Sequence, residues 1–91
     1  MAQIHGHNDP DAEIARAAAD YVTQWRILEA SEAYNQYYGS DLEKLQERRF
    51  NLIRDAPART LAALARKARL ALMTGSDDLL LALARDTAAM S

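Results

Sequence analysis

Side chains able to carry out chemistry are few in this sequence, and the first group of them lies near the N-terminus. His5 and His7, together with Asp9 and Asp11, are residue types that bind divalent metals. No third histidine completes the set. Residues 1–8 have no apolar period and are predicted to form a mobile tail, which cannot fix a coordination geometry. We therefore expect no metal site.

Candidates for catalysis are equally sparse. The chain contains no cysteine, which excludes disulfides, thiolate nucleophiles and cysteine-bound metals. Serine and threonine fall mainly at predicted helix caps, no histidine lies in a predicted helix, and there is no glycine-rich phosphate loop. The sequence therefore predicts no catalytic residues and no bound cofactor, and we expect that the protein is not an enzyme.

Basic residues gather in the middle of the chain. Residues 44–69 hold eight basic and two acidic side chains, a net charge of +6, whereas residues 1–41 hold seven acidic and two basic, a net charge of −5. A basic face on residues 48–69 indicates phosphate binding, and its expected nucleic-acid contacts are Arg59, Arg66, Lys67 and Arg69. The segment lacks the Asn, Gln and Ser expected to contact base edges. A solvated face, or pairing with the acidic N-terminal helix within the fold or across a dimer, explains the same basic residues more simply.

Aromatic residues form the third group. Tyr21 and Trp25 lie on a predicted core stripe, but Tyr34, Tyr37 and Tyr38 crowd one helix end and are less easily buried together in one core. Tyrosine is enriched at protein interfaces, where one end of its ring is dry and the other wet. We therefore expect these three tyrosines to form an interface.

The elements that position these groups are predicted to be helices. Asp9 and Pro10 are typical of a helix start. From there one apolar stripe recurs at helical spacing, and a second set follows on roughly the opposite side, so the helix either bends between Glu29 and Glu32 or packs between two partners. The first stripe is Ile14, Ala18, Tyr21, Trp25 and Leu28, and the second is Ile27, Ala30, Tyr34, Tyr37 and Tyr38.

A second helix is predicted to follow Gly39. Ser40 and Glu43 match the capping box, and the helix should end before Pro57, because the residue preceding a proline avoids helical backbone angles. The apolar positions expected on its buried side are Leu42, Leu45, Phe50, Leu52 and Ile53.

Pro57 suits the first turn of a third helix, which is the most clearly amphipathic segment of the chain. Its predicted core face is Leu61, Leu64, Ala65, Ala68, Ala71 and Leu72. The other helices should pack on this face, with Leu64 and Ala68 buried.

Gly75 should end the third helix and Ser76 should begin a fourth, since a left-handed glycine and an acid-rich first turn mark such boundaries. The predicted buried side of the fourth helix is Leu79, Leu80, Leu83 and Thr87.

These elements predict an all-α fold, a three- to four-helix bundle with a long N-terminal helix, in which residues 9–91 form a single domain. No period-two run indicates a strand. Much of the apolar content is alanine, so the core of a monomer is thin and we expect a homodimer. The N-terminus lacks the features of a signal peptide and no apolar run could span a bilayer, so we expect a cytoplasmic protein without a membrane partner.

Two stretches carry a resemblance. Residues 56–69 read Ala-Pro-Ala-Arg-Thr-Leu-Ala-Ala-Leu-Ala-Arg-Lys-Ala-Arg, and residues 79–86 read Leu-Leu-Leu-Ala-Leu-Ala-Arg-Asp. They resemble a group of small alphaproteobacterial proteins, some encoded near prophage genes, in which a proline-threonine turn precedes a Leu-Ala-rich helix. Ala62-Ala63 stands where the group has Ala-Gly. The resemblance covers about the last 35 residues and implies an all-helical fold, but no activity or functional residue.

The function expected from the sequence is that of a non-catalytic helical interaction module that self-associates, an accessory or regulatory protein of phage origin. Either the tyrosine-rich end of the first helix or the alanine-rich face of the third would form the contact between copies, and a protein partner of unknown identity is also expected. The alternative is a regulator that binds nucleic acid through residues 48–69.

Overall fold

The computed structural model describes residues 10–32 and 34–90, and the regular elements of that part are all α-helices. They are α1 (Pro10–Ser31), α2 (Tyr34–Tyr37), α3 (Asp41–Asp55), α4 (Leu61–Thr74) and α5 (Asp77–Met90). The predicted all-α class is confirmed. The described part has four longer helices and the single turn α2, so the expected bundle is met in outline. The predicted tail, with His5, His7 and Asp9, lies outside the described residues.

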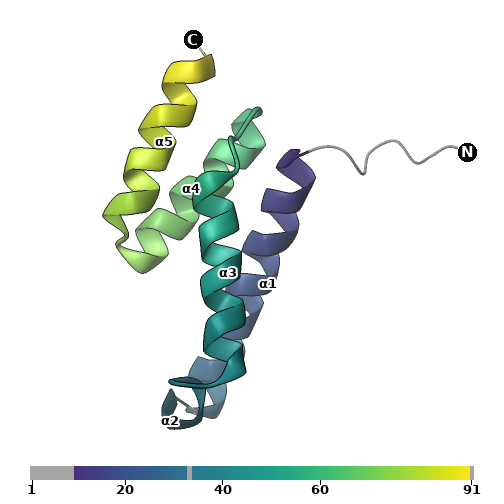
Figure 1. Cartoon of the computed structure of the whole chain (residues 1–91), viewed down its shortest axis with the longest axis vertical. Coiled ribbons are helices and arrows are strands. Elements are labelled where there is room, and N and C mark those ends of the chain that lie inside the picture. The colour runs from purple at the N-terminus through teal and green to yellow at the C-terminus, as the bar shows by residue number, and fades with distance from the viewer. Residues whose placement is uncertain (1–9, 33, 91) are drawn as a thin grey trace, which may run out of the picture.

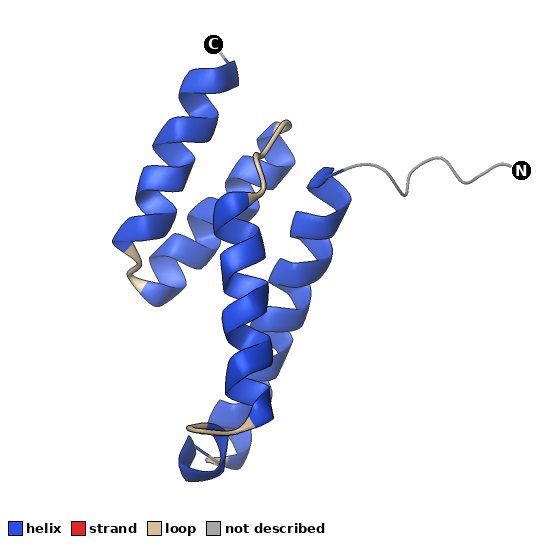
Figure 2. Cartoon of the chain, in the orientation of Figure 1, coloured by secondary structure: helices blue, strands red, loops and turns tan. Residues whose placement is uncertain are grey.

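Two antiparallel hairpins make up the fold (Figure 1). α3 runs back along α1, and α5 runs back along α4, to which it is joined by a short loop (Figure 2). α4 also packs on α1, and α5 contacts α3. The molecule measures 19 Å along its shortest axis, which is about two helix diameters. In a molecule only two helices thick, each helix has one side exposed to solvent.

The first hairpin depends on a break after α1. The helix ends at Ser31, Glu32 has a φ of 56°, and α2 begins at Tyr34. A positive φ is uncommon for a residue other than glycine, so this turn is a strained point in the backbone. The break brings Tyr34 and Tyr37 of the second apolar set back toward the first stripe, and the rings of Trp25 and Tyr37 lie 5.3 Å apart between centroids. Ile27 and Ala30 of the same set precede the break and are exposed. Of the two predicted arrangements, the structure therefore has the bend.

The predicted start and end of α3 are confirmed. The Ser40 hydroxyl accepts a hydrogen bond from the Glu43 amide at 3.3 Å. The Glu43 carboxylate reaches back as expected, although it accepts from the Gly39 amide, at 2.9 Å, and not from that of Ser40. α3 ends at Asp55, two residues before Pro57.

The start of α4 differs from the prediction. Pro57 lies in a connection, and α4 begins only at Leu61, where the Thr60 hydroxyl caps the helix by accepting from the Ala63 amide at 3.2 Å. Two distant carboxylates hold the connection extended. Asp11 accepts from the Arg59 amide at 3.0 Å, and Asp86 accepts from the Ala58 amide at 3.0 Å.

The boundary between α4 and α5 was predicted correctly. Gly75 adopts the left-handed conformation with a φ of 69°, which a residue with a Cβ rarely tolerates. The Ser76 hydroxyl then accepts from the Leu79 amide at 3.2 Å. The tight turn is what allows α5 to fold back along α4.

The core lies where α1 meets α3 and α4, and it is rich in alanine. The predicted α1 stripe is confirmed: Trp25 is half-buried and the other four residues are buried. Gln46 is buried as well, and it donates to the Tyr21 carbonyl at 3.1 Å. The main buried cluster is Ile14, Ala17, Ala18, Tyr21, Ile53, Ala58, Ala63, Leu70, Ala71 and Leu79.

Candidate functional site

α4 does not bury the face that its leucines predict. Leu61 is 79% exposed and Leu72 is 86% exposed, while Leu64 and Ala68 are half-buried. Leu64 and Ala68, which the sequence predicts to be buried, are therefore buried only in part, with Leu64 packed against the core. The residues that α4 buries are Ala63, Lys67, Leu70 and Ala71. Three of these four are small or charged, so α4 is rotated away from the orientation that its leucines favour.

Lys67 is fully buried, at 0% exposure. Its ammonium lies 2.5 Å from the Asp86 carboxylate of α5 and donates to the Ala56 carbonyl at 2.6 Å. A buried charge requires such partners, since an isolated one would be very costly. The prediction that Lys67 contacts nucleic acid is therefore wrong, because its charge is neutralised inside the protein.

Asp86 links three elements. Its carboxylate accepts from Lys67 of α4, from the Ala58 amide of the α3–α4 connection, and from Arg85 at 2.8 Å. Burial raises the pKa of Asp86, but the hydrogen bonds from Lys67, Ala58 and Arg85 outweigh it and hold the pKa below its ordinary value. The carboxylate therefore remains ionised and holds α5 against the rest of the protein.

A sequence signal for this ion pair did exist. On α5, helical spacing places Asp86 on one stripe with Leu79 and Ala82, and those are the residues that α5 buries. The predicted buried side included Leu80 and Thr87 instead, and both are exposed. Asp86 lies on an apolar stripe of α5, and Lys67 lies on an apolar stripe of the neighbouring helix α4. Such a pattern indicates a buried ion pair.

An apolar surface remains on the outside of the second hairpin. Positions 61, 65, 68 and 72 are spaced by four, three and four residues and form one stripe of α4, and positions 80 and 84 share a stripe of α5. Each stripe lies on the side of its own helix opposite to the residues that the helix buries, among them Lys67 of α4 and Asp86 of α5. We call the two stripes together the outer face; it comprises Leu61, Ala65, Ala68, Leu72, Leu80 and Ala84.

The three tyrosines of the predicted interface do not form one exposed surface. Tyr37 is buried, and burial, with nearby Tyr21 and Glu43, raises the pKa of its phenol. Tyr34 is half-buried, with its ring 6.4 Å from that of Trp25. Tyr38 alone is strongly exposed, at 61%. The expectation of an interface is therefore wrong for Tyr37, which packs within its own chain.

The remaining basic residues do not form one continuous face. Arg48 and Arg49 line a groove between α1 and α3 together with Glu13 and Asp20. Arg66 and Arg69 line a different groove, between α1 and α4. Arg59 is exposed in the connection before α4.

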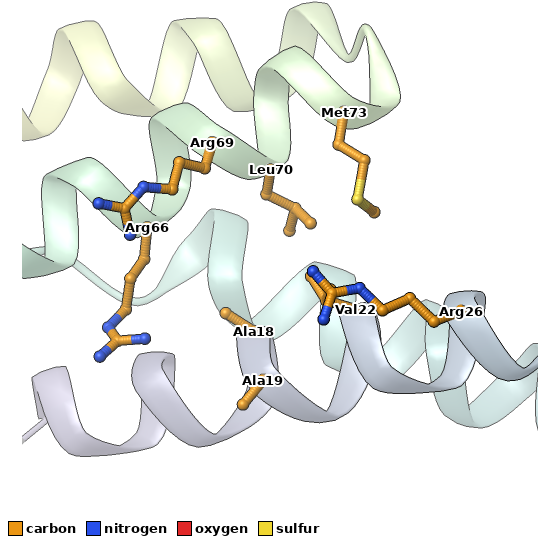
Figure 3. A pocket seen from close by; sticks show the side chains of 8 residues that line it. All are labelled: Ala18, Ala19, Val22, Arg26, Arg66, Arg69, Leu70 and Met73. Atoms are coloured by element: carbon orange, nitrogen blue, oxygen red, sulfur yellow. The ribbon is translucent and has the colours of Figure 1, made fainter.

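The groove between α1 and α4 has a volume of about 310 Å³. Its apolar walls include Val22 and Leu70, and its basic groups are Arg26 of α1 with Arg66 and Arg69 of α4. In Figure 3 Arg66 extends from α4 into the space between the two helices, and Arg26 reaches into it from α1.

None of these three arginines forms an ion pair with an acidic side chain of residues 10–32 or 34–90. The ion pairs among the described residues join Arg54 to Asp55, and both Lys67 and Arg85 to Asp86. The expectation that acidic residues of the first helix neutralise the basic face is therefore not met at Arg66 and Arg69.

Comparison with known proteins gives no relative for this chain: no family model, no curated protein and no solved structure matches it. Within the described residues, no group of histidine, cysteine, aspartate or glutamate side chains is placed to hold a metal ion. The helices of that part are also too short or too polar to cross a membrane. The candidate sites are therefore the outer face and the α1–α4 groove.

Proposed function

We propose that this protein is a non-catalytic helical interaction module that self-associates through the outer face of the α4–α5 hairpin. The observation that supports this most is the exposure of Leu61 and Leu72, at 79% and 86%, on a stripe that also carries Ala65 and Ala68. Single exposed leucines are common on protein surfaces. A stripe of them at helix-packing spacing is typical of a surface that a partner covers.

The energetics favour a second copy of the chain as that partner. Burying a leucine that is now exposed contributes about 1.5–3 kcal/mol. In a two-fold symmetric pair each residue of the outer face is buried twice, once in each copy. Ala65 and Ala68 are small, so the two α4 helices can approach closely between the leucines at either end.

Sedimentation velocity over a micromolar concentration series tests this proposal. The wild-type protein should form dimers as concentration rises, and Leu61→Gln/Leu72→Gln should stay monomeric. Both leucines are exposed, so the double variant should unfold within about 0.5 kcal/mol per site of the wild type.

The matched control is Ile27→Gln, because Ile27 is a 53% exposed apolar residue on α1, remote from the outer face. This variant should dimerise as the wild type does. A wild-type protein that stays monomeric throughout the series would contradict the proposal, and so would equal loss of dimer in the control and the double variant.

Nucleic-acid binding through residues 48–69 has weaker support. Lys67 is buried, and the arginines lie in two grooves on different sides of α1, whereas binding to a nucleic-acid backbone requires a basic surface that tracks successive phosphates. The accessory or regulatory role of phage origin stays a prediction from the sequence resemblance.

A further inference from the structure

The α1–α4 groove brings three positive charges around an apolar cavity. Arg26 comes from α1, and Arg66 and Arg69 come from successive turns of α4. No carboxylate among the described residues pairs with any of them. The three guanidinium groups point in different directions (Figure 3), and all three residues are exposed, so their long side chains are free to turn toward an anion in the groove.

The groups present select the kind of anion. A guanidinium group presents a planar fork of N–H donors that matches the two oxygens of a carboxylate or phosphate. The rest of the groove is apolar: Val22 lies on the α1 side, and Leu70 and Met73 point down from α4 (Figure 3). Methionine is a flexible side chain that adapts to different apolar shapes.

The dimensions also favour a small molecule. The volume of about 310 Å³ is at the lower end of the range of about 300–1,000 Å³ found for small-ligand sites. A nucleic-acid strand would fill an apolar groove of this size only with a base, and bases stack on aromatic side chains. No aromatic ring lines the groove. The groove therefore combines basic and apolar side chains in one lining.

We propose that this groove binds a small anionic amphiphile, an aliphatic chain with one carboxylate or phosphate head group. Arg26, Arg66 and Arg69 supply the positive potential that attracts the head group, and their exposed side chains turn to pair with it. The chain packs along Val22, Leu70 and Met73. The site lies on the α1 side of α4, away from the outer face, so binding does not depend on self-association.

Titration calorimetry with the full chain tests the site, using decanoate and decyl phosphate below their micelle concentrations as probes. Binding of either probe supports the proposal, and the tighter of the two identifies the preferred head group. Arg26→Gln/Arg66→Gln should weaken binding by at least about tenfold, the effect expected from losing one charge-assisted hydrogen bond. The control Arg48→Gln removes an exposed arginine outside the groove and should bind as the wild type does.

Three further probes define the outcomes that overturn the proposal. Inorganic phosphate should bind at least about tenfold more weakly than decyl phosphate, because it cannot use the apolar wall. Equal affinity would show a simple anion site. Binding confined to a DNA duplex would indicate nucleic acid, and binding confined to vesicles of anionic phospholipid would indicate a membrane surface. Absence of binding by both decyl probes at millimolar concentration would also overturn it.

Leu61→Gln/Leu72→Gln separates this proposal from the proposed function. Both leucines lie outside the groove, so the double variant should bind decanoate or decyl phosphate as tightly as the wild type. Loss of amphiphile binding in this variant would place the ligand on the outer face and contradict the assignment to the groove.

Discussion

The two hairpins are held together by different kinds of interaction. In the first hairpin the large side chains point inward: Tyr21, Trp25 and Tyr37 pack ring against ring. In the second hairpin, α4 and α5 bury Leu70, Leu79, three alanines and the Lys67–Asp86 pair, and the three leucines of the outer face remain exposed. The first hairpin therefore buries most of its aromatic surface, although Ile27 and Tyr38 stay exposed, whereas the second leaves leucines of both its helices exposed.

The difference also predicts how each hairpin responds to change. Ring packing involves no group that titrates between neutral and acid pH. A buried ion pair does, and removing one partner leaves the other charge in a medium that solvates it poorly. The second hairpin should therefore be the more sensitive to acid pH.

The largest effect is expected from Lys67→Met. The substitution leaves the Asp86 carboxylate buried without its main cation and should lower the free energy of unfolding by about 3–5 kcal/mol. Lys44→Met is the control, because Lys44 is exposed on α3, and it should change the free energy of unfolding by no more than about 0.5 kcal/mol. Urea denaturation followed by circular dichroism measures both variants.

Lys67→Met/Asp86→Asn should restore part of that loss. An asparagine removes the unpaired charge but keeps an oxygen that can accept from the Ala58 amide. A double variant less stable than Lys67→Met alone would show that the buried charge is not what destabilises the single variant.

The next effect is a dependence of stability on pH. The folded pKa of Asp86 lies below its unfolded value, so the ionised carboxylate stabilises the folded state above the unfolded pKa of about 3.9. That contribution is lost as pH falls below this value and through the folded pKa. Thermal denaturation between neutral and acid pH should therefore show a smaller acid loss in Lys67→Met/Asp86→Asn than in the wild type, and equal losses would count against the pair as the acid-sensitive element.

The smallest change in the free energy of unfolding is expected from substitutions at the helix caps. Such substitutions should have the same effect in both hairpins. Thr60→Ala removes the cap of α4 and Ser40→Ala removes the cap of α3. Each should lower the free energy of unfolding by about 1 kcal/mol, and glycine at either position by only a few tenths. Urea denaturation of the four variants checks the ranking, which would be contradicted if the alanine variants matched the wild type.

Local signals predicted the helices well. The cap at Ser40, the left-handed Gly75 and the apolar stripe from Ile14 to Leu28 depend on neighbours in sequence, and all are present. Pro57 was misplaced because the backbone there is held by Asp11 and Asp86, which are far away in sequence. Contacts over such distances leave no local pattern.

The candidate sites were only partly predictable, because the rotation of α4 depends on its partners. The leucine pattern of α4 predicts that Leu61 and Leu72 face the core. In the structure, the ion pair between Lys67 and Asp86 instead turns the Lys67 side of α4 toward the core. The same rotation brings Arg66 and Arg69 to the groove that Arg26 also lines, although Arg26 lies in the acidic part of the sequence. The groove could not be found without knowing how α1 and α4 pack.

The most direct test of the account is to locate the residues that sense self-association. Amide ¹H–¹⁵N spectra recorded from low micromolar to millimolar concentration should show shifts along the outer face, at Leu61, Ala65, Leu72 and Leu80, with little change at Tyr34 and Tyr38. Shifts confined to the tyrosines would place the interface on the first hairpin, and spectra that do not change with concentration would show that the outer face is not a dimer interface; either result would contradict the account.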